Sequence, residues 1–124
     1  MAINLVVAIV RESTVRNVVS KLYANNVPGV SVSPVRGYGE HVNVYSGDLT
    51  DDSVRVEVFV AEKNTRQVVD IIMQAANTGM EGDGIVSVLP VNEIYQIRDF
   101  SQLTDSNLTL TWLLNLSWFS LFPI

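Results

Sequence analysis

The sequence contains no cysteine, which excludes disulfide bonds, thiolate metal sites and cysteine nucleophiles. It has one histidine, His41, in a polar segment where a solvated side chain is a simpler interpretation than a catalytic base. Basic residues are also scarce, because 8 lysines and arginines are outnumbered by 13 acids, for a net charge of -5. This balance argues against nucleic acid or an anionic membrane surface as the main partner.

The first residues, "MAINLVVAIV", include no basic segment and no small-residue cleavage site, so we expect a strand there and not a signal peptide. The 124 residues suit one domain with one hydrophobic core. Together with the absence of cysteine, these features predict a cytoplasmic protein.

Apolar patterns predict four or five strands. A nearly continuous apolar run at 3–10 is typical of a buried strand, and the valines at 54–60 alternate with other residues as a half-buried strand does. A weaker alternation at 30–35 contains Pro34, which lacks an N–H and therefore favours a sheet edge. The stretches "IVSVLPV" and "EIYQI" predict one or two further strands, and residues 36–53 are predicted to form a long polar loop.

Two helices are predicted between these strands. We expect the first to be capped by Ser13 or Thr14, and the second to begin with a capping box of Asn64 and Gln67. Their apolar stripes are Val15, Val18, Val19, Leu22 and Tyr23 in the first, and Val68, Ile71, Ile72 and Ala75 in the second. The order β-α-β-β-α-β predicts an α+β, ferredoxin-like sandwich with both helices on one face of the sheet.

The composition changes abruptly after residue 105, so we divide the chain into a domain at 1–105 and an apolar tail at 106–124 of unknown role. The tail has two tryptophans and many leucines, but it is marginal for a membrane span, which needs about 20 apolar residues. A membrane anchor, packing against its own or a neighbouring subunit, and an end without an evolved role are the three interpretations.

Two glycine-rich segments, at 37–39 and 82–84, lie at the ends of predicted strands. Glycine lets the backbone approach a ligand closely, and successive N–H groups in such a segment can bind an anion. Ordinary tight turns are the alternative, since neither segment matches a Walker motif or a dinucleotide fingerprint. The aspartates of "GDLTDD" suit a hard cation, but they lack the spacing of a calcium loop, and a solvated acidic loop is the simpler interpretation.

Read together, these segments resemble the PII signalling family. The matching stretches run in unbroken order over about residues 3–98: "VVAIVRES", "VPGVSVSPVRGYG", "VRVEVFV", "QAANTGMEGDG" and "VLPVNEIYQIR". The resemblance implies a regulatory protein and not an enzyme, built as a homotrimer of ferredoxin-like protomers with adenine nucleotides in the clefts between subunits. It also implies a T-loop, here residues 40–53, that contacts partner proteins, and a B-loop, here residues 78–84, that cradles phosphate.

The resemblance assigns eleven residues to the nucleotide cleft. They are Ile9, Gly29, Ser31, Gly37, Tyr38, Gly39, Phe59, Gly82, Asp83, Gly84 and Arg98. Arg98 matches the last arginine of the family's R-I-R pattern and is expected to reach a neighbouring subunit's nucleotide. Asp83 is expected to lie in the B-loop without touching phosphate directly.

Three positions depart from the family pattern. Ile85 replaces the lysine after GDG, Gln96 replaces the first arginine of R-I-R, and Glu40 replaces a basic residue after the first glycine segment. Because phosphate loses three cations, we predict that ADP or AMP binds in preference to ATP. The T-loop is shorter than the family's usual loop and lacks an aligned tyrosine for uridylylation, and 2-oxoglutarate sensing by the usual chemistry is not expected.

These departures are similar to those of carboxysome-associated PII-like proteins, which implies bicarbonate as a second ligand and a role in bicarbonate, carbon or nitrogen metabolism. Arg36, Arg55 and Arg98 are the cations that we place near the clefts. The T-loop would contact an unidentified transporter or enzyme, and a membrane would be met only through such a target. We expect no cofactor and no resident metal.

Two other functions are kept as alternatives. The first is a metal-binding trimer of the divalent-cation-tolerance type, with ligands among His41, Asp48, Asp51 and Asp52. The second is a weak nucleotide hydrolase or transferase, for which Glu40, Glu81 or Asp83 would have to act as the base.

Overall fold

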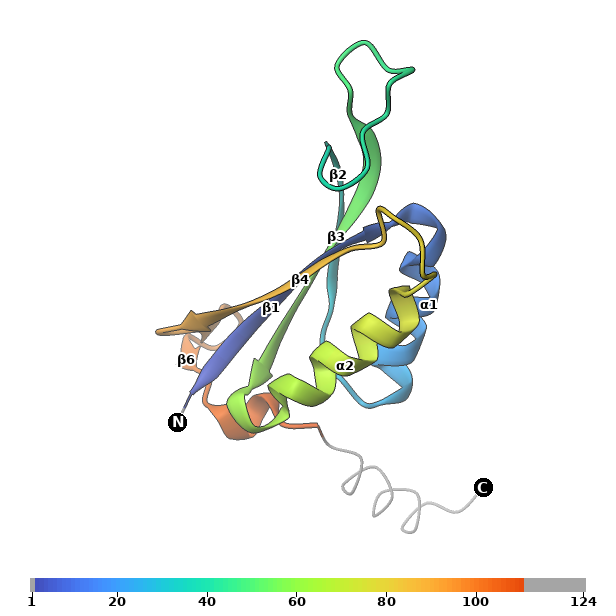
Figure 1. The fold of residues 1–124 in the computed structure, drawn as a ribbon. Coiled ribbons are helices and arrows are strands. Elements are labelled where there is room, and N and C mark those ends of the chain that lie inside the picture. The colour runs from blue at the N-terminus through green and yellow to red at the C-terminus, as the bar shows by residue number, and fades with distance from the viewer. Residues whose placement is uncertain (1, 111–124) are drawn as a thin grey trace, which may run out of the picture.

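A four-stranded antiparallel sheet is the centre of the computed structural model, which describes residues 2–110 (Figure 1). The strands are β1 (Ile3–Arg11), β2 (Ser31–Gly37), β3 (Asp51–Ala61) and β4 (Gly84–Val91), in the order β2-β3-β1-β4. The helices α1 (Glu12–Ala24) and α2 (Thr65–Ala76) lie side by side on one face of this sheet. This arrangement confirms the predicted ferredoxin-like class.

The core lies between the sheet and the two helices, and the period of the strands selects its members. In β3 the even-numbered valines are buried against the helices, and in β1 they face Val6, Ala8 and Val10 across the ladder. Leu22 of α1 and Ile72 of α2 are fully buried over these strands. Burial of this apolar surface is the main source of stability for the fold.

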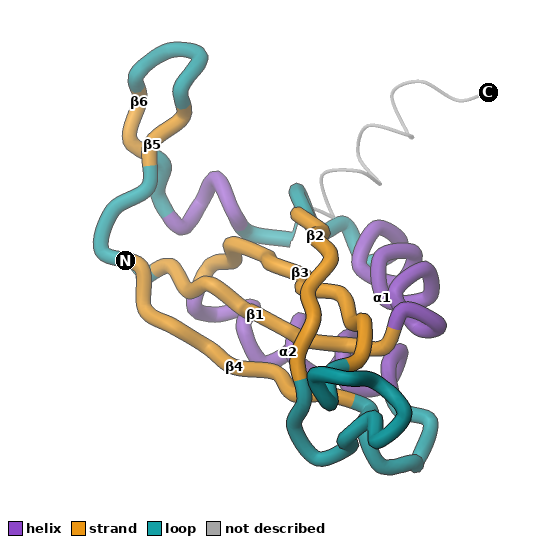
Figure 2. The backbone as a smooth tube through the Cα atoms, turned by 90° about the horizontal axis from the view of Figure 1, so that it is seen from above, coloured by secondary structure: helices purple, strands orange, loops and turns teal. Residues whose placement is uncertain are grey.

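The opposite face of the sheet is not covered by a described helix (Figures 1 and 2). Side chains that alternate with the core residues point to this face, among them Phe59, Ile85 and Leu89, which are 40%, 68% and 45% exposed. We call this surface the bare sheet face. Large exposed apolar side chains on an uncovered sheet face are typical of a contact with another protein chain.

The predicted start of the first helix was wrong. β1 runs directly into α1 with extended backbone at Arg11, and the structure shows no side-chain cap there. Thr14 lies inside the helix, where its hydroxyl donates a hydrogen bond of 3.1 Å to the carbonyl of Arg11. Ser13 is also within the helix and is exposed, because the strand delivers the chain into α1 without an intervening turn.

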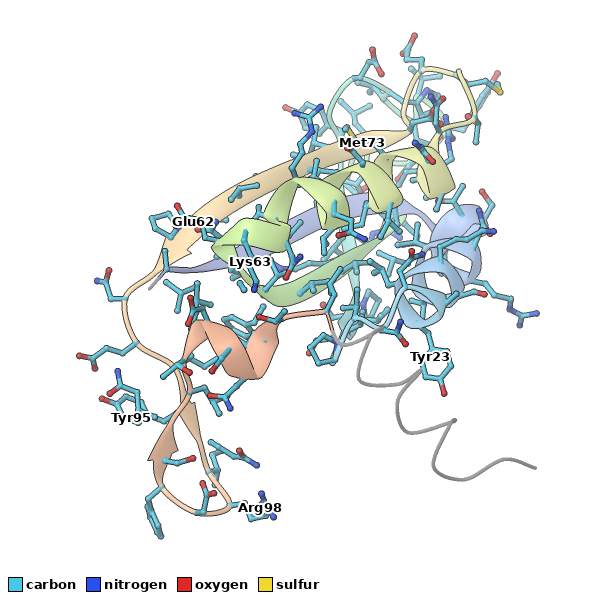
Figure 3. The ribbon with its side chains drawn as sticks, turned by 90° about the horizontal axis from the view of Figure 1, so that it is seen from below. Tyr23, Glu62, Lys63, Met73, Tyr95 and Arg98 are labelled. Carbon is cyan, nitrogen blue, oxygen red and sulfur yellow. The ribbon has the colours of Figure 1, made fainter. Side chains whose placement is uncertain are left out.

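The predicted inner stripe of α1 was wrong at Tyr23. Its side chain is 82% exposed and points away from the domain (Figure 3). Leu22 takes the central inward position, and successive residues of a helix are about 100° apart around the axis. Tyr23 is therefore turned out of the stripe that Val18 and Leu22 define.

The second helix begins after Asn64 as predicted, but the expected capping box is absent. A short 3₁₀ turn, η1 (Glu62–Asn64), leads into α2, and Asn64 makes no side-chain cap. Its amide oxygen instead accepts a hydrogen bond of 3.3 Å from the backbone N–H of Leu110. The side chain that sequence reasoning used as a cap therefore binds a distant part of the chain.

Strand boundaries differ from prediction in β3 and after β4. β3 begins at Asp51, earlier than the apolar alternation indicates, because Gly37 and Arg36 at the end of β2 pair with Asp51 and Asp52. Pro34 lies in β2 at the edge of the sheet, as its missing N–H requires. Within "EIYQI", the strand β5 is limited to Tyr95–Gln96, which pairs with β6 (Ser101–Gln102) in a hairpin separate from the main sheet (Figure 2).

The first residues beyond the predicted domain boundary lie against the domain. Leu108, in the 3₁₀ turn η2 (Asp105–Leu108), is buried, and Leu110 packs on the core. The division at residue 105 stays a prediction, and the rest of the tail, residues 111–124, lies outside the described residues. Within residues 2–110 no helix combines the length and apolar character that crossing a membrane requires.

We predict that Leu22→Ala and Tyr23→Ala differ sharply although the two residues are adjacent. Leu22→Ala leaves a cavity in the core and should lower the free energy of unfolding by about 2–5 kcal/mol. Tyr23→Ala removes an exposed side chain and should change it by about 0.5 kcal/mol or less. Urea denaturation at one fixed protein concentration measures both values, and equal losses would contradict the placement of Tyr23 in solvent.

Candidate functional site

One cavity of about 720 Å³ lies where the T-loop leaves the sheet and the B-loop returns to it. Of the residues assigned to the nucleotide cleft, six line it: Ile9, Gly37, Tyr38, Gly39, Gly82 and Gly84. The other lining residues are Arg11, Ser13, Val35, Arg36, Glu40, His41, Asp51, Asp52, Ser53 and Ile85. The two glycine segments therefore meet in one site.

The register of the sheet explains this meeting. β2 ends where β3 begins, with Gly37 opposite Asp51, and β1 ends where β4 begins, with Val10 opposite Gly84. Arg11 is opposite Ser53, so β1 and β2 end, and β3 and β4 begin, at the same end of the sheet. The T-loop and the B-loop both leave from this end (Figure 1).

Gly84 permits the closest backbone approach in the site. Its φ is +116°, and a Cβ built there would lie 1.8 Å from the carbonyl oxygen of Ile9. No other residue type fits that space, so glycine is what allows β4 to begin directly against β1. The amide groups of the B-loop are thereby held at the cavity edge.

Asp83 holds the B-loop in shape. Its carboxylate accepts hydrogen bonds from the backbone N–H groups of Thr78 at 2.8 Å and Gly79 at 3.0 Å, and from the hydroxyl of Thr78. Arg11 Nε also donates to it at 3.0 Å, and another guanidinium nitrogen of Arg11 donates to the carbonyl of Glu81. We call this set of contacts the Asp83 network. It occupies the carboxylate fully, so Asp83 shapes the loop, and it is not among the residues that line the cavity.

The hydroxyl of Thr78 is the main reason that the pKa of Asp83 lies well below its ordinary value of 3.8, with Arg11 and the two backbone N–H groups acting in the same direction. The carboxylate therefore stays ionised in acid conditions that protonate ordinary aspartates. Each hydrogen bond that Asp83 accepts is made to the charged form of its carboxylate.

Glu40 bridges the two loops. Its Oε1 accepts a hydrogen bond of 2.9 Å from the backbone N–H of Gly82, so the first residue of the T-loop is bonded to the B-loop. Next to it, His41 Nδ1 lies 4.0 Å from Glu81 Oε1. A Cβ built on Gly82 would lie 3.0 Å from the Cβ of His41, which shows how closely the segments pack.

Arg36 holds the other end of the T-loop. It contacts Asp52 at 2.8 Å, Asp48 at 3.6 Å and the hydroxyl of Thr50 at 3.0 Å. Asp48 also accepts hydrogen bonds from the hydroxyl groups of Ser46 and Thr50. The bond from Ser46 is the main reason that the pKa of Asp48 is lowered, and Thr50 acts in the same direction. Of the aspartates that sequence reasoning considered as metal ligands, Asp48 and Asp52 thus bind Arg36, and Asp48 also binds hydroxyl groups. Within residues 2–110 no group of three or more His, Asp or Glu side chains could hold a metal ion.

The cavity wall carries more negative than positive charge. Among the described lining residues, Arg11 and Arg36 are the two cations, and Glu40, Asp51 and Asp52 are the three carboxylates. Both arginines are already paired with acids. A phosphate group bound here would therefore rely on backbone N–H groups and on arginines that it shares with the protein.

Besides Asp83, four of the assigned residues lie outside this cavity in the single chain. Gly29 and Ser31 are at the opposite end of β2, and Phe59 is on the bare sheet face, paired with Leu5. Arg98 is between β5 and β6, exposed and away from the sheet (Figure 3). Their proposed roles concern a cleft between subunits, and they stay predictions.

Sequence reasoning missed Arg11, and its placement of Arg55 near a cleft between subunits stays a prediction. Arg11 ends β1 and lines the cavity, whereas Arg55 pairs with Glu57 farther along β3 and is not in the lining. The sequence does contain an arginine at the end of β1 and an aspartate between two B-loop glycines, and this pair could have indicated that Arg11 lies at the site. That signal becomes visible only when β1 and β4 are known to be neighbours.

The fold that brings two glycine segments together at one end of an antiparallel sheet is one that known proteins share. A family model for nitrogen regulatory protein P-II matches residues 3–100 of the chain. The chain belongs to the P-II family. This confirms the resemblance found in the sequence. The members of this family are regulatory signalling proteins, and we refer to the protein below as the P-II chain.

Relatives and a solved structure agree with this assignment. The P-II homolog of Arabidopsis thaliana is 34% identical over 99 residues, which are 73% of this chain and 50% of that relative. Nitrogen regulatory protein GlnK2 of Haloferax mediterranei is 35% identical over 104 residues, 77% of this chain and 84% of that relative. The crystal structure of Arabidopsis PII bound to citrate matches with a TM-score of 0.73 and 33% identity, covering 82% of this chain and 89% of that one. The P-II chain spans about half the length of the Arabidopsis relative and, at 47%, of a rice relative.

We predict that Asp83→Asn removes an acid-dependent part of the stability of the P-II chain. Because the pKa of Asp83 is lowered by folding, its carboxylate stabilises the fold above the ordinary value of 3.8, and this contribution is lost as the pH falls toward the lowered pKa. The variant should therefore be less stable at neutral pH and should lose less stability than the wild type below about pH 4.

Denaturant midpoints measured across that pH range test this expectation. Thr78→Val is the companion variant, since it removes the hydroxyl that contributes most to the lowered pKa while keeping the carboxylate. Its acid dependence should lie between those of the wild type and Asp83→Asn. Identical acid dependence in all three proteins would show that the Asp83 network does not stabilise the loop.

Proposed function

We propose that the P-II chain is a trimeric regulatory protein that binds ADP or AMP at the cavity edge and reports binding through the T-loop. The observation that carries this proposal is the Gly82 N–H, which already has a carboxylate as its partner at 2.9 Å. A position where a backbone amide holds an anionic oxygen is suited to a phosphate oxygen. The six predicted cleft residues that line the same cavity support this proposal.

The preference for fewer phosphates follows from the charge of the wall. Ile85 lies in the lining, 68% exposed, at the position where the family resemblance expects a lysine. The two arginines of the lining must also neutralise three carboxylates. A third phosphate would add negative charge without a new cation to pair with it, so triphosphate binding is disfavoured.

The bare sheet face supports assembly into a trimer. It exposes Phe59, Ile85 and Leu89 together, and a soluble chain rarely leaves such a surface in water. Assembly would also bring the exposed Arg98 of one subunit toward another subunit, where its forked guanidinium suits phosphate oxygens. Gly29, Ser31 and Phe59 would then gain their predicted roles between subunits.

The T-loop suits contact with a protein target, a transporter or an enzyme. Val44 and Tyr45 are exposed near its tip, and Tyr45 reaches 96% exposure. The departures from the family pattern also support membership of the PII-like branch that responds to ADP or AMP with bicarbonate. A relative binds a small carboxylate, since the crystal structure of Arabidopsis PII contains bound citrate. Arg36, at the cavity edge, is the side chain that would hold such a second anion.

Calorimetric titration with adenosine, AMP, ADP and ATP tests nucleotide binding. We expect ADP and AMP to bind, adenosine to bind more weakly because it lacks phosphate, and ATP to bind about tenfold more weakly than ADP, the scale of one charge-assisted hydrogen bond. Repeating the ADP titration with bicarbonate tests the second ligand. No heat with any of the four compounds at about 100 μM protein would remove nucleotide binding from the proposal.

Two substitutions at matched exposure test the trimer. Phe59→Glu places a charge on the bare sheet face, and Met73→Glu places the same charge on the outer side of α2, where Met73 is 43% exposed (Figure 3). We expect sedimentation to show trimers for the wild type and Met73→Glu, and dissociated chains for Phe59→Glu, since a buried charge opposes association. A monomeric wild type, or a trimer that tolerates Phe59→Glu, would refute assembly through this face.

A further inference from the structure

We propose that Glu40 is an intramolecular competitor for the anion position of the B-loop. Its carboxylate is bound where a ligand phosphate would bind, so that a nucleotide reaches the Gly82 N–H only by displacing Glu40, which releases the start of the T-loop. This inference rests on the proposed nucleotide site and adds to it the residue that sets the affinity and couples the site to the T-loop.

The contact has the geometry of a bound anion. Glu40 Oε1 lies 2.9 Å from the Gly82 nitrogen, inside the usual range for a charge-assisted hydrogen bond. Gly82 has a φ of +91°, a conformation that favours glycine and that turns its N–H toward the cavity edge occupied by Glu40. The space next to it is filled by His41 and by Arg11, whose Nη2 would lie 3.3 Å from a Cβ built on Gly82. Arg11 and His41 thus lie beside Gly82, whose N–H holds the Glu40 carboxylate.

Competition follows from the chemistry of the donor. One N–H group makes one strong hydrogen bond, so the Gly82 N–H cannot serve Glu40 and a phosphate oxygen together. Two anions at this short distance also repel each other, and Arg11 is held by Asp83 and the carbonyl of Glu81. A phosphate at Gly82 therefore requires the Glu40 carboxylate to leave.

The T-loop is built to move as a unit when that contact breaks. Its middle is closed by backbone hydrogen bonds from Asn43 to Leu49, from Ser46 to Asn43 and from Leu49 to Ser46, and its far end is held by Arg36. At its near end, the contacts with the B-loop are the Glu40 bond and the approach of His41 to Glu81. Displacing Glu40 frees the near end while the far end stays attached to β3.

The test compares the wild type with Glu40→Gln, Glu40→Ala and the control Glu81→Gln. Glu81→Gln removes the same charge from the residue next to Gly82, but its carboxylate is not on the Gly82 N–H. ADP affinity is measured by calorimetry, and the Gly82 amide resonance is followed by ¹H–¹⁵N NMR without ligand and with ADP.

We expect Glu40→Ala and Glu40→Gln to bind ADP about tenfold more tightly than the wild type, and Glu81→Gln to gain clearly less. In the absence of ligand, the Gly82 amide resonance should move in Glu40→Ala. In the wild type, ADP should increase hydrogen exchange at residues 40–42, and Glu40→Ala should show that increase without ADP.

Three results would contradict the inference, and each of them points to a different reason for its failure. If the wild type binds ADP and the Glu40 variants bind it equally or more weakly, Glu40 is not a competitor. If Glu81→Gln gains as much as Glu40→Ala, general charge and not occupancy of the Gly82 N–H sets the affinity. If neither the wild type nor any variant binds a nucleotide, the proposed function fails and the inference fails with it. Binding by the Glu40 variants alone would support strong competition.

Discussion

The hydrogen-bond network around Asp83 is the interaction on which the rest of the site depends. Thr78 and Gly79 begin the B-loop, and Arg11 ends β1, so a single carboxylate ties the bend to the central strand of the sheet. Close approach of Gly84 to Ile9 fixes the other end of the same bend. Because both ends are fixed, the N–H of Gly82 has a defined direction and the cavity has a defined wall. A segment rich in glycine is thus shaped by a side chain and by close backbone packing, and not by its own backbone preference.

The sequence predicts the periodic parts of the fold well because burial follows the geometry of strands and helices. The alternating valines of β3 and the stripe of α2 are found in the core as expected. Errors fall where a tertiary contact overrides a local preference. Asn64 binds Leu110 instead of capping α2, and Tyr23 lies just beyond the arc that Leu22 fills. Such outcomes depend on neighbours that the local pattern does not specify.

The candidate site divides in the same way. Gly82 and Gly84 were identifiable, since glycine marks positions of positive φ and close approach, and the structure shows both at this bend. Its charged contacts were not, because Arg11 meets Asp83 across 72 residues of sequence and Glu40 meets Gly82 across 42. Glu40 was recognised in the sequence as an acid in place of a base, which predicts weaker phosphate binding. The structure adds the position of its carboxylate, which accepts the N–H of Gly82. Glu40 therefore does more than fail to attract phosphate, because it already uses the N–H group that we propose for phosphate.

An internal anion also gives the site a connection with the T-loop that a cation would not give. If Glu40 and phosphate exclude each other at Gly82, then any partner that holds the T-loop away from the B-loop must strengthen nucleotide binding. By linkage, the nucleotide strengthens binding of that partner by the same factor. A partner that needs Glu40 in place would have the opposite effect. The coupling is bounded by the strength of one charge-assisted hydrogen bond, so it shifts populations of the T-loop by about tenfold and does not act as an absolute switch. A modest shift of this size suits the proposed role, in which the protein reports a gradual change in adenylate level.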